Sequence, residues 1–135
     1  NNNTFVHPGF IRSGLWNFPD LQVNEYFHGT SLKNALEIKR SKCWVIGRST
    51  PHAIYLTIDI GVAVGYADNH SNPAVILIKV KSGIRLEYDP NVKGKGIATS
   101  GKLILKVPNS NPDEIVYLPE LQFLSVFDRK GNLIE

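Results

Sequence analysis

The stretch Ala74–Val80 constrains the fold more than any other part of the chain. Apart from Lys79, all of its residues are apolar. A strand with one exposed face alternates apolar and polar residues, whereas a near-continuous apolar run is typical of a strand that is buried on both faces. The sequence therefore predicts a central, fully buried strand at this position.

Two short helices are expected before this strand. Thr30 or Ser31 is the expected N-cap of the first, over residues 31–41, because a hydroxyl group can accept a hydrogen bond from a backbone N–H of the first turn. Asp59 is the expected N-cap of the second, which Pro73 would end because proline cannot continue a helix. One face of this second helix carries Ala63, Tyr66 and Ala67.

Short apolar or alternating segments predict the other strands. The clearest alternation is Ile84-Arg85-Leu86-Glu87-Tyr88, which is typical of a half-exposed strand. Further strands are expected at 25–29, 43–46, 53–57, 103–107, 114–117 and 123–127. Two helices among this many strands predict an α+β domain in which strands dominate the second half.

The chain is expected to form one domain. Its 135 residues are enough to bury about two-thirds of the unfolded surface in a single core. Residues 1–24, which are rich in Asn, Pro and Gly, are expected to form an irregular arm that packs its aromatic side chains on the core. Residues 25–135 are expected to be the domain itself, and it is expected to be monomeric. Because the chain has no methionine even at its start, it is expected to be part of a larger or processed protein.

The charge of the chain is compatible with several partners and specific to none. The net charge of +3 and the pI of about 9.0 are compatible with nucleic acid or an acidic partner, but the charge density is far from that of a dedicated nucleic-acid binder. Lys93, Lys95, Lys102 and Lys106 either steer RNA, DNA or an acidic protein toward the domain or form a solvated face. No run of 18 apolar residues and no signal-peptide pattern occurs, so a soluble domain without a membrane partner is expected.

Several common kinds of site are excluded by the sequence. A single cysteine, Cys43, cannot form an internal disulfide or a cysteine-rich metal site, and it is expected to be a buried apolar residue. Residues 96–102 nearly match a P-loop, but Leu103 stands where Ser or Thr would bind magnesium. No nucleophile elbow supports Ser-His-Asp catalysis. No metal site is expected either, because the histidines lie in separate segments without paired spacing: His7, His28, His52 and His70.

Three segments far apart in the sequence hold the remaining candidates for chemistry. His28 ends an aromatic strand, and Gly29 after it allows close approach of a ligand at a helix N-terminus with unpaired N–H groups. Tyr55 lies in a second expected strand, Tyr66 on the helix after it, and Glu114 starts a late strand. Each residue alone fits a packing or solvated role, whereas together they indicate one ligand site.

In these segments the sequence resembles the ADP-ribosyltransferase family of the His-Tyr-Glu type, which includes diphtheria-like toxins and the poly(ADP-ribose) polymerases. The resemblance lies in Tyr26-Phe27-His28-Gly29-Thr30-Ser31, in Ala53-Ile54-Tyr55-Leu56-Thr57 continuing to Ala63 and Tyr66-Ala67, and in Glu114-Ile115-Val116-Tyr117 continuing to Gln122. No single motif is specific, and the likeness rests on the order of all three over most of the chain from residue 25 onward. It implies two packed, mainly antiparallel sheets with short flanking helices around a cleft for NAD.

The resemblance also implies roles toward NAD as a co-substrate, without a metal. His28 would hold a ribose hydroxyl, and Gly29 would bond the nicotinamide amide through its backbone. Tyr55 and Tyr66 would enclose the nicotinamide ring between them. Glu114 would bond the 2′-hydroxyl of the nicotinamide ribose and complete a catalytic triad with His28 and Tyr55.

Four further positions belong to the comparison with the family, and two of them, Ala63 and Asp113, depart from its pattern. Thr30 would lie near the adenosine ribose. Arg48, from its position and charge alone, is expected to reach the diphosphate. Ala63 stands where the polymerases often have a serine that bonds the nicotinamide amide, so that contact is absent. Asp113 beside Glu114 leaves the identity of the catalytic acid open.

The activity that the resemblance implies is mono-ADP-ribosyl transfer from NAD to a protein or nucleic acid, with release of nicotinamide, in a bacterial toxin or effector that is secreted or delivered into a target-cell cytosol. The chemistry suits these residue types. Nicotinamide in NAD is a cationic leaving group, and one carboxylate can stabilise the oxocarbenium-like transition state. Two alternatives stay open: an NAD glycohydrolase, and a catalytically inactive module that binds NAD or nucleic acid on the same fold.

Overall fold

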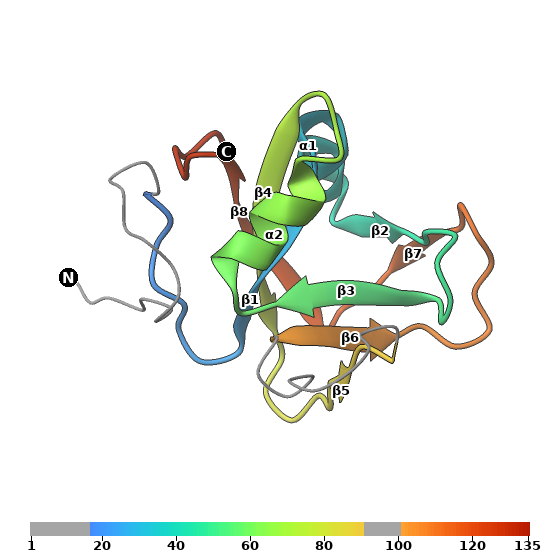
Figure 1. Cartoon of the computed structure of the whole chain (residues 1–135). Helices are drawn as coiled ribbons and strands as arrows, with labels where there is room; N and C mark the ends of the chain where they lie inside the picture. Colours follow the sequence, from blue (N-terminus) through green and yellow to red (C-terminus); the bar gives the residue numbers. More distant parts are fainter. Residues whose placement is uncertain (1–16, 91–100) are drawn as a thin grey trace.

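The computed structural model describes residues 17–90 and 101–135 (Figure 1). The first sixteen residues of the expected N-terminal arm, with His7, lie outside the described residues, as do Lys93 and Lys95. In the described remainder of the arm, Phe18 packs edge-on against the rings of Phe27 and Phe127, with ring centres 5.8 and 5.6 Å apart. No helix in the described ranges is both long and apolar enough to cross a membrane.

Two helices and a mainly antiparallel set of strands confirm the α+β class. In chain order the described elements are β1 (Glu25–Ser31), α1 (Leu32–Ser41), β2 (Cys43–Val45), β3 (Ala53–Thr57), α2 (Ile60–Ala67), β4 (Pro73–Val80), β5 (Glu87–Tyr88), β6 (Lys102–Lys106), β7 (Ile115–Tyr117) and β8 (Leu121–Asp128). Six of the strands form one sheet in the order β5-β6-β3-β1-β4-β8, and β2 and β7 form a separate two-stranded sheet.

The six-stranded sheet is nearly divided between β1 and β3. β1 pairs with β4 from Glu25 to Ser31, but it meets β3 at a single register position, Phe27 opposite Thr57. Figure 1 shows the consequence, because β3 and β6 run across the direction of β1, β4 and β8. The sheet therefore opens beyond Phe27, and this opening is where the site described below lies.

The central strand predicted at 74–80 is β4, and it is buried on both faces. Ala74, Ile76, Ile78 and Val80 pack into the same core cluster as Ala35 and Ile38 of α1. Val75 and Leu77 pack on the other side with α2 and Phe127. The two helices thus cover opposite faces of the sheet, with α2 in front of β1 and β4 in Figure 1 and α1 behind them.

Of the two caps predicted for the first helix, Thr30 and Ser31, the structure has Ser31, and the second helix begins at the predicted cap Asp59. The Ser31 hydroxyl accepts a hydrogen bond from the Asn34 N–H at 3.1 Å, and the Asp59 carboxylate accepts one from the Gly61 N–H at 2.9 Å. α1 ends at Ser41, and its C-cap Lys42 adopts a left-handed conformation with φ 62° and donates its backbone N–H to the Ile38 carbonyl. The sequence thus located both helix starts through the hydrogen bonds that a first turn requires.

Three local predictions were wrong. α2 ends at Ala67, well before Pro73, because Asp68 caps it and Pro73 already belongs to β4. Of the strand expected at 84–88, only Glu87–Tyr88 pairs with a neighbour, since β6 offers it a partner only at Leu103 and Ile104. Cys43 is half-buried rather than buried, because it lies in the two-stranded β2–β7 ribbon.

Gly29 allows α2 to lie directly on β1. A Cβ atom at this position would overlap the carbonyl oxygen of Ala63 and lie 2.9 Å from the backbone nitrogen of Ala67. Both neighbours are fully buried backbone atoms of α2, so neither can move without the helix. The absence of a side chain at Gly29 therefore sets the distance between the strand and the helix.

We expect Gly29→Ala to lower the free energy of unfolding by at least about 1–3 kcal/mol, since the added methyl group overpacks a helix–strand contact. Gly65→Ala is the matched control, because a Cβ at Gly65 in the same helix meets nothing within 4 Å. Its expected effect is a gain of about 0.5–1 kcal/mol from the better helix propensity of alanine. Urea unfolding of both variants tests this, and equal effects would contradict the close-packing account.

Candidate functional site

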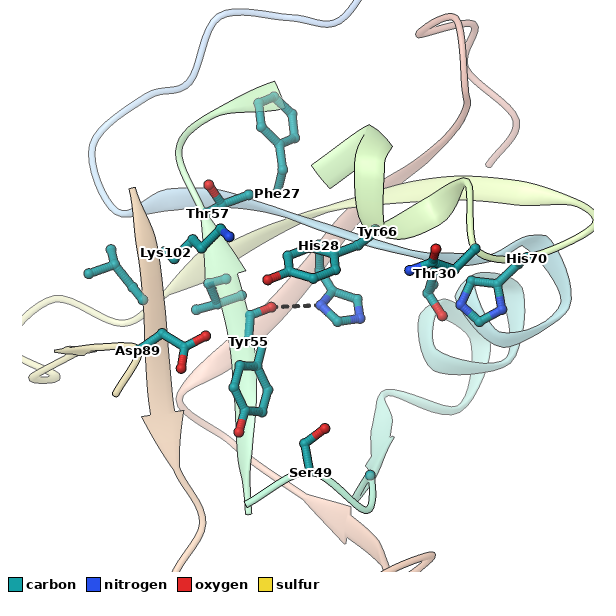
Figure 2. A pocket seen from close by; sticks show the side chains of 15 residues that line it. Phe27, His28, Thr30, Ser49, Tyr55, Thr57, Tyr66, His70, Asp89 and Lys102 are labelled. Carbon is teal, nitrogen blue, oxygen red and sulfur yellow. Dashed lines mark hydrogen bonds between the residues drawn. The ribbon is translucent and has the colours of Figure 1, made fainter. Parts of the chain in front are cut away.

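A cavity of about 560 Å³ opens where β1 and β3 separate (Figure 2). Its walls come from β1, β3, the end of α2, β6 and the loop after β2. The lining residues are Phe27, His28, Gly29, Thr30, Gly47, Ser49, Tyr55, Leu56, Thr57, Tyr66, Asn69, His70, Asp89, Lys102 and Leu103. Five of the residues predicted from the sequence are among them: His28, Gly29, Thr30, Tyr55 and Tyr66.

The side chain of His28 bridges the opening in the sheet. Its Nδ1 lies 2.6 Å from the carbonyl oxygen of Tyr55, and its ring packs edge-on against Trp44 with centres 4.7 Å apart. Because a carbonyl oxygen can only accept, Nδ1 carries the proton, and in the neutral ring Nε2 then presents a lone pair. The residue is thereby fixed in one tautomer, with Nε2 able to accept a hydrogen bond from a ligand hydroxyl.

Burial holds His28 in this neutral form. Desolvation lowers the pKa of His28 below its ordinary value of 6.5, the bond to the Tyr55 carbonyl opposes this change, and the charge of His70 adds to it. A hydrogen-bond acceptor rather than a cation therefore occupies this wall of the cavity at neutral pH.

Gly29 and Thr30 continue the wall along β1. Thr30 is buried, and its hydroxyl oxygen accepts a hydrogen bond from the side-chain amide of Asn34 at 2.9 Å. Gly29 contributes only backbone atoms to the wall. The space that a side chain would fill at this position is taken by α2.

The two predicted tyrosines reach the cavity in different ways. The Tyr55 hydroxyl donates to the carbonyl oxygen of Pro51 at 2.7 Å, so its ring points along β3 toward the loop that contains Ser49 (Figure 2). Desolvation first, and then the charges of Asp89 and Tyr66, raise the pKa of Tyr55. Tyr66 projects from α2 and keeps 44 % of its surface exposed, and the Lys102 ammonium lies over its ring, 5.6 Å from the ring centre. The exposed part of the ring can take a stacking partner.

Glu114 lies beside the cavity but does not line it. Its backbone carbonyl accepts the Ile46 N–H at 2.9 Å, which places it next to the chain that continues into the lining residue Gly47. The carboxylate itself is exposed and accepts the backbone N–H of Asn111 at 2.8 Å. The backbone is thus close to the site, while the side chain is turned toward its own loop.

Arg48 and Asp113 form an exposed ion pair at the same edge. The guanidinium Nη2 of Arg48 lies 2.5 Å from the Asp113 carboxylate, and the arginine side chain is 77 % exposed. Neither residue lines the cavity, although Gly47 and Ser49 on either side of Arg48 do. The carboxylate of Asp113 thus pairs with Arg48, whereas that of Glu114 accepts a hydrogen bond from a loop amide.

Several lining residues were not predicted from the sequence. Thr57 could have been found, because it follows Tyr55 by two residues and so shares its face of β3. Asn69 and His70 follow Tyr66 at three and four residues and continue its turn through bonds to the Tyr66 and Ala67 carbonyls. Asp89 and Lys102 reach the cavity through the pairing of β6 with β3 and β5, and no local sequence pattern predicts this pairing.

The residues at the cavity suit an organic ligand with hydroxyl groups and an aromatic ring. They provide a neutral imidazole acceptor, an open phenol ring, one carboxylate and one lysine. Within the described ranges, no group of three or more His, Cys, Asp or Glu side chains converges as metal ligands. Comparisons of the chain with protein-family models, with curated proteins and with solved structures found no match.

The buried neutral His28 predicts a pH dependence of stability. The pKa of His28 lies below 6.5 in the folded protein, so the unfolded chain takes up the proton first as the pH falls. The contribution of neutral His28 to the free energy of unfolding is therefore fully present above pH 6.5 and is lost progressively below it. The free energy of unfolding should fall by up to about 1.4 kcal/mol per pH unit in this range because of His28. His28→Asn keeps a donor near Nδ1 but does not titrate, so its free energy of unfolding should depend less on pH below 6.5. The same slope of free energy against pH for both proteins, measured by urea unfolding, would count against a buried neutral imidazole.

Proposed function

We propose that the protein is an NAD-dependent ADP-ribosyltransferase that moves ADP-ribose to a macromolecular acceptor and releases nicotinamide. One observation carries the proposal: His28, Gly29, Thr30, Tyr55 and Tyr66, predicted from separate motifs, meet in one cavity. The near division of the sheet at Phe27 and Thr57 also fits the two-sheet arrangement around a cleft that this class implies. The cavity volume lies within the usual range for small-molecule sites.

In this proposal the cavity holds the nicotinamide riboside part of NAD. Nε2 of His28 accepts a hydrogen bond from a ribose hydroxyl, because the Tyr55 carbonyl already uses the Nδ1 proton. The nicotinamide ring stacks on the part of the Tyr66 ring that the Lys102 ammonium leaves exposed. The Tyr55 hydroxyl is held by the Pro51 carbonyl, so the Tyr55 ring forms the cavity wall beneath the ribose and does not stack on the nicotinamide ring.

The carboxylate for the reaction comes from Glu114. Breaking the bond between ribose C1′ and the nicotinamide nitrogen leaves positive charge on the ribose, and a nearby carboxylate stabilises this charge. Glu114 reaches the ribose when its side chain leaves the Asn111 N–H, an exposed hydrogen bond that water can replace at little cost. The same carboxylate then accepts the proton of the attacking acceptor group.

Arg48 binds the diphosphate in this proposal. Its exposed ion pair with Asp113 contributes little to stability, so replacing that carboxylate by a phosphate costs little free energy. The fork of N–H donors on a guanidinium matches phosphate oxygens well. Asp113 would then hold Arg48 at the edge of the site in the absence of NAD rather than act on the ribose.

We expect the protein to release nicotinamide from NAD, and Glu114→Gln to slow this release by about 10²–10⁴-fold with little change in KM, since the carboxylate acts mainly in the transition state. Chromatography of nicotinamide over time measures the rate. Glu37→Gln, an exposed glutamate on α1, is the matched control and should behave as wild type. Wild-type rates in Glu114→Gln would remove the assigned carboxylate.

Tyr66→Ala should weaken NAD binding by about two- to twelvefold, because a stacked aromatic pair contributes roughly 0.5–1.5 kcal/mol. Tyr66→Phe keeps the ring and should bind as wild type. Tyr117→Ala, which removes a tyrosine on β7 that is 66 % exposed and lies outside the cavity lining, is the control. Calorimetric titration with NAD provides the measurement. Stacking on Tyr66 would be excluded by equal loss in the Ala and Phe variants or by no loss in either.

NAD labelled in the adenosine part separates the remaining alternatives. Label on a protein or nucleic acid identifies a transferase, and free ADP-ribose alone identifies a glycohydrolase. NAD binding without any nicotinamide release would identify an inactive binding module.

A further inference from the structure

The loop between β6 and β7 carries Glu114 at its end, and hydrogen bonds rather than burial hold its shape. Of residues 108–114, Ser110 is partly buried and the others are exposed. The Ser110 hydroxyl donates to the Val107 carbonyl at 2.6 Å and closes a first turn. In a second turn the Glu114 N–H donates to the Asn111 carbonyl at 3.1 Å, and the Asn111 N–H donates to the Glu114 carboxylate at 2.8 Å. The place of Glu114 therefore depends on how this loop is attached to the rest of the domain.

The two ends of the loop are attached through the backbone. At the start, the Val107 N–H donates to the His52 carbonyl at 3.0 Å. At the end, the Asp113 N–H donates to the Ile46 carbonyl at 2.8 Å, and the Ile46 N–H donates to the Glu114 carbonyl at 2.9 Å. These bonds fix where the loop leaves β6 and where it enters β7, and the position of its middle depends on other contacts.

The side chain of His52 attaches the middle of the loop. Its Nδ1 lies 2.8 Å from the carbonyl oxygen of Ser110. Because a carbonyl oxygen can only accept, Nδ1 carries the proton and donates it. Both residues are half-buried, so water competes less for this bond than for the bonds of the exposed loop residues.

The segment that contains His52 also contacts the cavity wall. The carbonyl of Pro51, directly before His52, accepts the hydroxyl of the lining residue Tyr55 at 2.7 Å. Figure 1 shows the start of β3 and the loop between β6 and β7 at the same end of the molecule. His52 itself is not among the residues that line the cavity. Two neighbouring residues thus connect the cavity wall with the loop that carries Glu114.

We propose that His52 is a positioning residue for the Glu114 carboxylate. It holds the Ser110 carbonyl, and with it the turn from which Glu114 reaches the ribose. The inference rests on the proposed function, because it requires that Glu114 acts on a ribose in the cavity. Without this bond the exposed loop samples more conformations, and the carboxylate is in place for a smaller fraction of the time.

Three substitutions at His52 test the bond. His52→Asn keeps a donor N–H near the position of Nδ1, His52→Gln carries the same amide one methylene farther out, and His52→Ala has no donor. We expect His52→Ala and His52→Gln to lower kcat for nicotinamide release by about two- to twelvefold, the factor for one hydrogen bond, with KM for NAD unchanged. His52→Asn should restore most of the rate. The Asn and Gln variants alone decide the question if the alanine variant does not fold.

Asn132→Ala is the matched control, because it removes a side-chain hydrogen bond of similar length, 3.0 Å to Asp128, from the turn after β8 outside the cavity lining. It should leave kcat and KM as in wild type. A wild-type kcat in His52→Gln, or an equal loss in the Asn and Gln variants, would overturn the role of His52. A raised KM with unchanged kcat would also overturn it, because that is the result for a direct contact with the substrate.

A double-mutant cycle with Glu114→Gln tests whether His52 acts through Glu114. If His52 positions this carboxylate, His52→Ala or His52→Gln has no further effect on the rate once the carboxylate is gone. The same fold-loss in both backgrounds would contradict the proposal, since a general loss of structure slows both proteins alike.

Backbone mobility gives a readout that does not depend on activity. In ¹⁵N relaxation, the Asn111 amide should be more mobile in His52→Gln than in wild type and His52→Asn, and equal mobility would contradict the attachment of the loop by His52. The two levels of the account fail differently. A wild-type protein that releases no nicotinamide contradicts the proposed function and with it the role of His52 toward Glu114, whereas an active wild type with unaffected His52 variants contradicts the role of His52 alone.

Discussion

The contact between α2 and β1 at Gly29 is the constraint on which the rest of the site depends. With no Cβ at this position, the carbonyl oxygen of Ala63 can lie directly on the strand. That approach buries Ala63 and Ala67 completely and leaves Tyr66, on the adjoining part of the helix surface, at the cavity. A glycine that the motif suggests for ligand approach thus acts first through packing, and through that packing it places the aromatic ring.

The second determinant is the point at which β1 and β3 separate. Their register contains one pair, Phe27 opposite Thr57, and beyond it the bond from His28 Nδ1 to the Tyr55 carbonyl joins the two strands. A side chain therefore satisfies a carbonyl that would otherwise lack its ladder partner. The same bond fixes the tautomer of His28 and leaves Nε2 as a hydrogen-bond acceptor in a residue that lines the cavity.

The sequence predicted the parts of this structure that depend on local physics. The caps at Ser31 and Asp59 and the doubly buried strand at 74–80 follow from hydrogen-bonding requirements and hydrophobic pattern, and all three are present. The motifs also named five residues that share one cavity. What local patterns did not contain is the pairing of β6 with β3 and β5, which brings Lys102 and Asp89 to that cavity.

The orientation of side chains at the cavity edge was equally beyond local patterns. Arg48 and Glu114 were predicted to face the ligand, but the nearest partners of their charges are Asp113 and a loop amide. Which partner an exposed charged side chain takes depends on small differences in free energy, so local sequence patterns do not determine the orientation of these two side chains.

The most direct test of the central claim is a crystal structure of the protein with a carbocyclic NAD analogue that cannot be cleaved. We predict that a hydroxyl of the ring that replaces the ribose lies within hydrogen-bond distance of His28 Nε2, with the nicotinamide ring against Tyr66. An analogue bound outside the opening between β1 and β3, or no bound analogue at saturating concentration, would contradict the account.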